Sequence, residues 1–600
     1  PLDKKINKYE LNLCLKDLTD QQQIACHQDI YYYLQSLPKI TGEIKLLNNK
    51  KILKFSSNEA IIINNDVYVE NEQVNAFLIK KEDKYFAFVD QVLSSSPMLI
   101  VGQADNNQFI PWERGFNNLT LALPENFNAN QNLFYSCLIS RKNNNFNLSS
   151  FQPISDIEQN NFASILAKER YALEENIAPY QVNQSIDDNN YKDYKDLTDL
   201  AFITIDGPST KDIDDAVYAF FDGHLAKIYV AIADPSSVVS LNSPLDVNAR
   251  KLASSSYFPH LVIPMLPRPL SEEACSLKEN EIRPSLVMEA SFKLEDDNWH
   301  LLNSQIFNAK IKSKWRSTYQ EINNILTGIN IPDKATPEII NSILILNQYA
   351  KFCQNNETSL FDNKEIIFKL NAAGKISHLE TSIRTPADLL VEKAMILANA
   401  EAARFLSQHG FGQGLFRNQY SPEIDLENEL SEEEKSAALK RLLRPAFYDR
   451  ENIGHFSLQK RYYTHFTSPI RRYADLMVHR LLKSIINNQP PPYKQQEIKD
   501  ITALINIQLQ KIKMATNKAK NILLNEYAQQ FINQPLTAKI IEVMPAGYLI
   551  QTENLLEGFI PKFMGEYDLH QSLNVKIESV DYANEKIKFV VDGYTKKNKP

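Results

Sequence analysis

The chain has 600 residues, of which 43% are hydrophobic and 23% are charged, with a formal net charge of −8 and a pI near 5.8. This length predicts several folded domains with sizeable cores. No apolar run reaches the roughly 18 residues that a membrane helix needs, and residues 1–17 lack the apolar core of a signal peptide. We therefore expect a soluble, cytoplasmic protein with no membrane partner. The five cysteines are scattered without a CxxC spacing, which argues against a disulfide framework and a zinc site.

The first 198 residues change pattern three times. Residues 18–38 follow the possible caps Thr19 and Asp20 with helix-compatible apolar spacing, which predicts an N-terminal helical segment over 1–40. Short alternating segments separated by polar turns then predict one OB-type β-barrel over 41–95 and another over 96–153. A helix and an acidic linker follow over 154–198. OB barrels bind single strands through stacking aromatics and a basic groove, so these regions favour a nucleic-acid partner.

An aspartate-rich stretch, AFITIDGPSTKDIDDAVYAFF, begins at residue 201. It places Asp206, Asp212, Asp214 and Asp215 between two apolar runs. Carboxylates this close repel one another unless a divalent cation lies among them, and hard oxygen ligands without Cys or nearby His favour Mg²⁺ or Mn²⁺ over zinc. Such ions serve phosphate chemistry, in which one activates water and a second stabilises the leaving oxygen. The alternative is an acidic turn or a structural calcium loop, although the EF-hand pattern counted from Asp206 is absent.

Four sequence blocks carry a resemblance to a known family. TIDGPSTKDIDDAVY resembles the signature of the ribonuclease II catalytic domain, called RNB, and further matching blocks occur in order at residues 257–277, 389–406 and 463–482. The resemblance, closest to bacterial exoribonuclease II, covers residues 199–527. It implies a multidomain α+β protein with a mixed α/β catalytic domain over 199–532. Two N-terminal cold-shock-like OB barrels and one C-terminal S1-type OB barrel over 533–594 would flank that domain.

The resemblance also implies an activity and a metal cofactor. Family members are processive, magnesium-dependent exoribonucleases that degrade single-stranded RNA from the 3′ end to nucleoside 5′-monophosphates. By position, Asp206 and Asp215 would hold one ion, while Asp212 and Asp214 would hold the other and position the attacking water. Asp214 is the carboxylate we expect to be least replaceable. We expect a monomer that needs no obligate protein partner.

Other residues gain roles from the resemblance. Arg471 would stabilise the transition state, with Arg472 beside it, because Ser468 and Pro469 predict a helix start whose first turn favours anions. The alternative for Arg471 is an i,i+4 bridge to Asp475. Aromatic and ribose contacts would come from three further positions and one acid: Tyr257 and Phe361 stacking on bases, Tyr319 holding the terminal nucleotide, and Glu392 contacting the ribose. The alternative for Glu392 is a helix-surface acid paired with a lysine, and most aromatics in any chain serve the core.

Two stretches of the chain are basic although its net charge is negative. Residues 460–483 and 511–520 concentrate Lys and Arg, which makes them candidate walls of an RNA channel, with solvated helix faces as the alternative. Within the second stretch Thr516 replaces a glutamate that relatives often carry, which leaves the channel contacts open. The catalytic region further predicts helices over 337–356, 386–408, 429–443, 469–487 and 496–532, and the last barrel places Gly547 and Gly558 at turns or bulges.

Two other readings remain open. One is an RNA-binding protein with an inactive nuclease core. The other is the ribonuclease R branch, which acts on structured RNA and usually carries a long lysine-rich tail, whereas this chain ends in TKKNKP.

Overall fold

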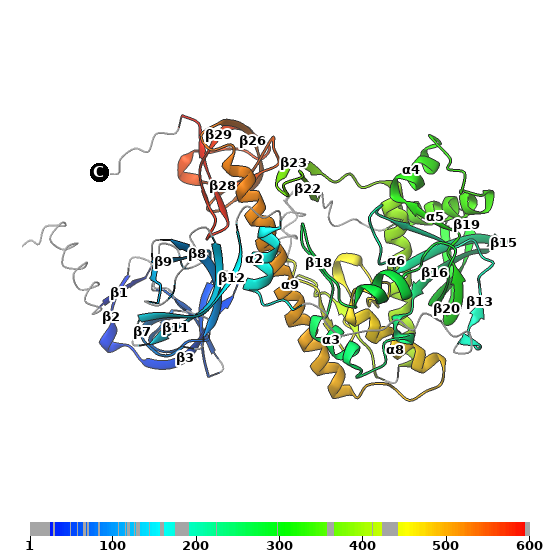
Figure 1. Ribbon diagram of the computed structural model, residues 1–600, viewed down its shortest axis with the longest axis horizontal. Coiled ribbons are helices and arrows are strands. Elements are labelled where there is room, and N and C mark those ends of the chain that lie inside the picture. The colour runs from blue at the N-terminus through cyan, green and yellow to red at the C-terminus, as the bar shows by residue number, and fades with distance from the viewer. Residues whose placement is uncertain are drawn as a thin grey trace, which may run out of the picture. The chain divides into compact units, whose positions relative to one another are not determined.

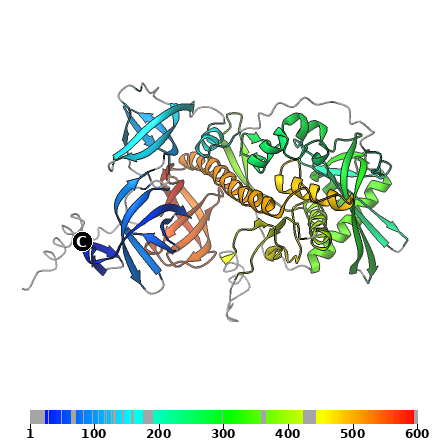
Figure 2. The same ribbon diagram turned by 90° about the horizontal axis from the view of Figure 1, so that it is seen from below.

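The computed structural model describes residues 24–593 except 28–29, 48–49, 57, 64–67, 69–70, 82–83, 96, 106, 114–115, 117–119, 125–126, 128–132, 143–144, 157–160, 175–190, 224, 297, 357–364, 411 and 423–441. The chain divides into two compact units (Figures 1 and 2). The first contains residues up to 172, 370–377 and 518 onward, and the second contains 173–369 and 378–517.

The first unit begins with a hairpin. Strand β1 (Ile24–His27) pairs antiparallel with β2 (Ile30–Tyr33), and the 3-10 turn η1 (Leu34–Ser36) follows. The helix predicted over 18–38 is therefore wrong in its described part. The run of isoleucine and tyrosines at 30–33 favours extended backbone, and this β propensity outweighed the helical spacing.

The predicted first OB barrel is confirmed as a closed, five-stranded β-barrel. Its strands follow the order β3-β4-β5-β7-β6. Alternating side chains fill the interior, and Ile44, Leu53 and Val74 are fully buried. The strands are β3 (Lys39–Leu47), β4 (Lys50–Phe55), β5 (Asn58–Ile62), β6 (Gln73–Lys81) and β7 (Lys84–Ser94).

The second β-rich region forms a five-stranded antiparallel sheet in the order β10-β9-β8-β11-β12. Its described strands show no pairing between β10 and β12 that would close the barrel. Helix α2 (Phe162–Arg170) packs on β12 and β8. The strands are β8 (Met98–Asp105), β9 (Gln108–Pro111), β10 (Leu121–Ala122), β11 (Leu133–Lys142) and β12 (Asn145–Asp156).

The C-terminal barrel is closed, in the order β26-β27-β28-β30-β29. Gly558 lies inside a strand, which corrects the predicted turn or bulge. A Cβ at Gly558 would come within 2.1 Å of the Phe589 ring, so the missing side chain allows this ring to fill the barrel. The strands are β26 (Pro535–Met544), β27 (Gly547–Thr552), β28 (Glu557–Pro561), β29 (Ser572–Asp581) and β30 (Lys586–Val591), and η6 (Lys562–Met564) follows β28.

The second unit is built on a mixed seven-stranded sheet in the order β13-β20-β19-β16-β15-β14-β21. The two edge pairs, β13 with β20 and β14 with β21, are parallel, and the other pairs are antiparallel. The mixed α/β catalytic domain is thereby confirmed. The strands are β13 (Lys195–Asp196), β14 (Ile203–Asp206), β15 (Asp215–Asp222), β16 (Leu225–Ala233), β19 (Ile282–Glu295), β20 (Asn298–Lys312) and β21 (Trp315–Thr318).

Helices pack against this sheet around one continuous apolar core. The helices predicted over 337–356 and 386–408 are confirmed closely. The predicted helix 429–443 lies almost entirely outside the described residues. The helices are α3 (Pro244–Leu252), α4 (Tyr319–Thr327), α5 (Pro337–Asn356), α6 (Pro386–His409), α8 (Tyr473–Ile486) and α9 (Gln495–Gln529). Within the described parts of the chain, no helix has the length and apolarity to cross a membrane.

Short elements complete the described structure. Each pair of strands forms a small two-stranded sheet. The pairs are β17 (Ser256–Tyr257) with β18 (Val262–Ile263), β22 (Ile366–Leu370) with β23 (Ile376–Thr381), and β24 (Phe416–Asn418) with β25 (Phe447–Asp449). The single turns are η3 (Pro235–Ser237), η4 (Pro269–Ala274) and η5 (Phe456–Leu458).

Candidate active site

The four aspartates occupy one end of two neighbouring strands. Asp206 is the last residue of β14, Asp215 is the first residue of β15, and Asp212 and Asp214 lie in the loop between them. Because these strands are antiparallel neighbours, their connection brings the carboxylates to the same edge of the sheet. The sequence prediction of a strand-loop-strand carboxylate cluster is confirmed in this respect.

Ser276 holds the aspartate loop in place, although no sequence argument singled it out. Its hydroxyl donates to the Lys211 carbonyl at 2.7 Å and accepts from the Ile213 amide at 3.2 Å. The Leu277 amide also donates to the Ile213 carbonyl at 3.0 Å. These bonds fix the loop backbone and thereby the direction of the neighbouring carboxylates.

Asp214 and Arg471 are in direct contact. Arg471 Nε donates to Asp214 Oδ2 at 3.2 Å, and the Ile470 amide donates to Asp214 Oδ1 at 2.9 Å. Arg471 Nη2 also donates to the Ser468 hydroxyl at 3.0 Å. Asp214 is only 4% exposed, whereas the Arg471 side chain is 43% exposed, so this contact joins the buried aspartate loop to the block at residues 463–482. The alternative bridge from Arg471 to Asp475 is not the contact that forms.

Burial raises the pKa values of the aspartate cluster by more than the nearby arginines lower them. It raises the pKa of Asp214 to about 7, although Arg471 acts in the opposite direction. It also raises the pKa of both Asp206 and Asp215, which repel each other. A group of buried carboxylic acids with raised pKa values is typical of a functional site.

The donor chemistry of this cluster suits a hard divalent cation. Four carboxyl groups that repel one another would be stabilised in their charged form by Mg²⁺ or Mn²⁺. Among the described residues, however, no three His, Cys, Asp or Glu side chains converge as a ready metal site. Asp214 instead faces Arg471, and Asp212 accepts a bond from Tyr257. The side-chain types therefore suit a divalent cation, but in this arrangement Asp214 is bonded to Arg471 and Asp212 to Tyr257.

Two predicted aromatic residues lie at the cluster. The Tyr257 hydroxyl donates to Asp212 Oδ2 at 3.0 Å, and its side chain remains 44% exposed. Tyr319 opens α4 behind a capping box of Thr318 and Glu321, and the charges of Asp215 and Asp206 add to burial in raising its pKa. Phe361 lies outside the described residues.

Glu392 forms a surface ion pair. It accepts from Arg384, and its carboxylate lies 3.7 Å from Lys393 Nζ. The alternative considered from sequence, an acid of the helix surface paired with a cation, describes this contact. No described contact links Glu392 to the aspartates.

The predicted helix start at Ser468 is wrong. Helix α8 begins at Tyr473, and Arg472 is its N-cap residue, so neither arginine lies in a helical first turn. Residues 468–471 instead form a tight turn, in which the Ser468 carbonyl accepts from the amides of Arg471 and Arg472 at 3.3 and 3.0 Å. The amide of Ser468 and the guanidinium of Arg472 anchor it by donating to Asp475 Oδ1, at 2.9 and 2.7 Å. Both arginines therefore bond a buried acid, Arg472 bonding Asp475 and Arg471 bonding Asp214, but the Arg471 side chain is 43% exposed and that of Arg472 is 23% exposed.

The two basic stretches serve the core more than a channel. Arg480 Nη1 lies 2.7 Å from Asp246 Oδ1, and Lys483 Nζ lies 2.6 Å from Asp234 Oδ2. Lys518 is buried and donates to the Trp112 carbonyl at 2.8 Å. The prediction that these residues line an RNA channel is wrong for these three cations. Thr516 donates within α9 to the Ile512 carbonyl at 3.0 Å.

Comparison with known proteins assigns the second unit to a family. Residues 194–488, which include the mixed sheet and the carboxylate cluster at its edge, match the RNB domain. Ribonuclease R from Buchnera aphidicola subsp. Schizaphis graminum is 27% identical over 639 residues, covering 93% of this chain and 86% of that protein. Exoribonuclease 2 from the same organism is 33% identical, covering 61% of this chain and 62% of that protein. Residues 194–488 therefore form an RNB domain, and the chain is similar to proteins named ribonuclease R and exoribonuclease 2.

A solved structure supports the fold. Mycoplasma genitalium RNase R in complex with ribose methylated single-stranded RNA matches 92% of this chain and 100% of its own, with a TM-score of 0.79 and 22% identity. Alignments with relatives that are 33% identical span 54% and 62% of those proteins.

Proposed function

We propose that this chain is a hydrolytic, processive 3′→5′ exoribonuclease that degrades single-stranded RNA to nucleoside 5′-monophosphates with Mg²⁺ or Mn²⁺. The observation that carries the proposal is the contact of buried Asp214 with Arg471 inside a cluster of four aspartates at one sheet edge. Both blocks lie within the RNB match, and related proteins are named ribonuclease R and exoribonuclease 2.

The residues divide the chemical tasks. Asp206, Asp212, Asp214 and Asp215 would hold the metal, which supplies charge to the phosphate and lowers the pKa of water. Arg471 bonds Asp214 and Ser468 without substrate, and its fork of N–H donors suits a phosphate equally well.

The aromatic residues would position the strand. The Tyr257 ring is half exposed beside Asp212, so a base could stack on its face while the hydroxyl stays at the cluster. Tyr319 lies near Asp206 and Asp215 and would contact the terminal nucleotide. Stacking of this kind is indifferent to sequence, which an enzyme that digests along a strand requires.

A labelled single-stranded poly(A) digestion tests the proposal. With Mg²⁺ and 5′-labelled RNA, we expect AMP to accumulate and the labelled strand to shorten from its 3′ end, and we expect a chelator to stop both. Binding of the RNA without any release of mononucleotide would instead identify an RNA-binding protein with an inactive nuclease core.

Ribonuclease R behaviour is the second candidate. The ribonuclease R alignment covers 93% of this chain, and the Mycoplasma genitalium relative has also been solved in complex with double-stranded RNA. A duplex with a short 3′ overhang separates the branches. Digestion through the duplex would support ribonuclease R behaviour, whereas a stall at a fixed distance from the duplex would support ribonuclease II behaviour.

A further inference from the structure

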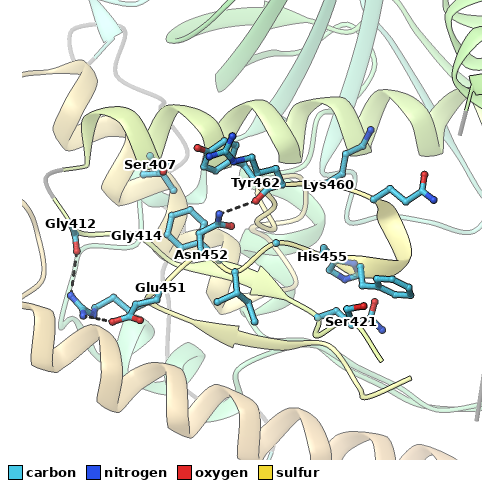
Figure 3. Close-up of a pocket in the computed structure, with 18 of the residues that line it drawn as sticks. Ser407, Gly412, Gly414, Ser421, Glu451, Asn452, His455, Lys460 and Tyr462 are labelled. Atoms are coloured by element: carbon cyan, nitrogen blue, oxygen red, sulfur yellow. Dashed lines mark hydrogen bonds and ion pairs between the residues drawn. The ribbon is translucent and has the colours of Figure 1, made fainter. Parts of the chain in front are cut away.

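The small β24–β25 hairpin of the second unit has a pocket on one face and an arginine on the other. The pocket has a volume of about 840 Å³, and Gly414 and Ser421, which lie on either side of β24 in the chain, are labelled among its lining residues (Figure 3). Phe416 also lines the pocket, whereas Arg417 does not. Because successive side chains of a strand point to opposite faces, the Arg417 side chain leaves the hairpin on the side away from the pocket.

Arg417 lies against an aromatic ring. Its register partner across the hairpin is Tyr448, and its guanidinium carbon lies 4.7 Å from the centroid of that ring. Tyr448 is 3% exposed, and its hydroxyl lies 2.6 Å from Nδ1 of His465, so the ring is held in place. A ring face attracts a cation but does not neutralise its charge. The ring therefore positions the guanidinium and leaves its positive charge available.

The Arg417 guanidinium has no acid partner. Within the described part of the chain, no oxygen accepts a hydrogen bond from it and no acid forms an ion pair with it. The side chain is partly buried, yet none of its nitrogens is among the buried atoms that lack a partner, so each can be reached by solvent. Burial lowers the pKa of the guanidinium, and the charge of Arg472 acts in the same direction. A cation in such surroundings is stabilised when an anion binds to it.

Two further arginines lie in the same neighbourhood. After burial, the charges of Arg472, Arg417 and Arg471 all lower the pKa of His465. Arg471 and Arg472 each bond a buried acid, whereas no acid among the described residues neutralises Arg417. Since Arg471 contacts Asp214, this group of cations adjoins the aspartate cluster. An anion bound at Arg417 would therefore lie beside the turn that reaches the candidate active site.

We infer that Arg417 binds a phosphate group of the RNA strand, as a binding residue additional to Arg471. A phosphodiester carries one negative charge and presents two terminal oxygens, which suit the fork of N–H donors that the Tyr448 ring leaves open. Its charge would balance the cation that lacks an acid. The choice of RNA as the source of the phosphate rests on the proposed function. A free nucleoside 5′-monophosphate presents the same chemical group, so the experiment includes both ligands.

The salt dependence of RNA binding tests the inference. A labelled single-stranded oligoadenylate is titrated with the full chain in a chelator at several salt concentrations. Each phosphate contact of a single strand contributes about 0.7 to the slope of the logarithm of the binding constant against the logarithm of salt concentration. Arg417→Gln should reduce the magnitude of this slope by about 0.7 and weaken binding at low salt about tenfold. Arg417→Lys keeps the charge and should keep the slope.

Melting temperatures separate a binding role from a structural one. Arg417→Gln leaves no acid unpaired, so it should keep or raise the melting temperature. Arg250→Gln is the matched control, because Arg250 also lies over a ring, that of Tyr473, but is paired with Asp246 at 2.8 Å. This control should lower the melting temperature and leave the salt slope unchanged.

A titration with AMP identifies the source of the phosphate. Loss of both AMP and RNA affinity in Arg417→Gln supports a site for the terminal nucleotide, and loss of RNA affinity alone supports an internal phosphodiester. An unchanged salt slope in Arg417→Gln, an equal decrease in Arg250→Gln, or no RNA binding to the wild-type chain would overturn the inference. The nuclease proposal fails separately, if RNA binding depends on Arg417 but Mg²⁺ releases no AMP from the strand.

Discussion

Two groups of buried aspartates in the same unit have opposite electrostatic surroundings. Asp234 and Asp246 each face a cation, and although burial opposes the effect, Lys483 and Arg480 lower the pKa of these carboxyl groups. In the cluster from Asp206 to Asp215, Arg471 contacts Asp214, and Arg316 acts on Asp206, but burial still raises the pKa values of Asp206, Asp214 and Asp215. Asp234 and Asp246, which stabilise the fold, are each neutralised by a cation. The aspartates at the sheet edge together carry more negative charge than the nearby cations neutralise. This difference is what we expect where a cation or a phosphate must enter.

The largest expected effect is on chemistry at the aspartates of the sheet edge. Asp214→Asn should reduce RNA hydrolysis by more than about 1,000-fold, because a neutral amide holds a divalent ion far more weakly than a carboxylate does. Initial rates of AMP release, with RNA affinity measured in parallel, check this. RNA binding should stay within a few-fold of wild type, and normal turnover would show that Asp214 is not a metal ligand.

The paired group should instead respond in stability. Lys483→Met keeps the side-chain length and leaves Asp234 buried without its cation, which should lower the free energy of unfolding by about 3–5 kcal/mol. Chemical denaturation measures the change. The control is Lys251→Met, whose partner Glu174 is exposed, and it should cost less than about 1 kcal/mol. Equal effects of both substitutions would remove the distinction between the two groups.

The two neighbouring arginines should differ in the same way: a change at Arg471 should affect catalysis, and a change at Arg472 should affect stability. Arg471→Lys keeps the charge but loses the fork that reaches both Asp214 and Ser468, so we expect kcat to fall about 100-fold. Single-turnover kinetics at saturating RNA isolate this step. Arg472→Lys, which loosens the bond to Asp475, should mainly lower the melting temperature, and the reverse pattern would exchange the roles of the two arginines.

The last expected effect is a pH dependence of stability. A carboxyl group whose folded pKa is raised, as for Asp214 to about 7, stabilises the fold fully below its unfolded pKa of about 4 and loses that contribution as the pH rises to 7. In a chelator, the free energy of unfolding should therefore fall between pH 4 and pH 7, by at most about 1.4 kcal/mol per pH unit for this group. Denaturation curves of wild type and Asp214→Asn compare the slopes, and an equally steep variant would contradict the assignment.

The sequence predicted the parts of this protein that depend on local pattern. The apolar runs around 201–221 gave two strands with aspartates at their ends, and alternating segments gave the first and last barrels, because side-chain period determines the buried face. The start of α8 was predicted wrongly. Ser468 and Pro469 resemble a helix cap, but the bonds to Asp475 fold residues 468–471 into a turn, and a tertiary contact of this kind leaves no local mark.

Charge partners were also beyond the sequence. The lysines and arginines of 460–483 read as one basic face, yet Arg480 and Lys483 bind acids more than 200 residues earlier in the chain. Ser276 was missed for the same reason, since a lone serine carries no pattern that predicts a bond to the Ile213 amide.

The bonds of Asp475 have one consequence for how this protein tolerates change. The Ser468 amide and the Arg472 guanidinium donate to Asp475 Oδ1. The Ile470 amide and the Arg471 guanidinium, from the same segment, donate to Asp214. The segment is therefore clamped at both faces over a few residues. Inserting or deleting a single residue between Ser468 and Asp475 would break one clamp or the other, so this stretch has a fixed length even where its side chains can vary.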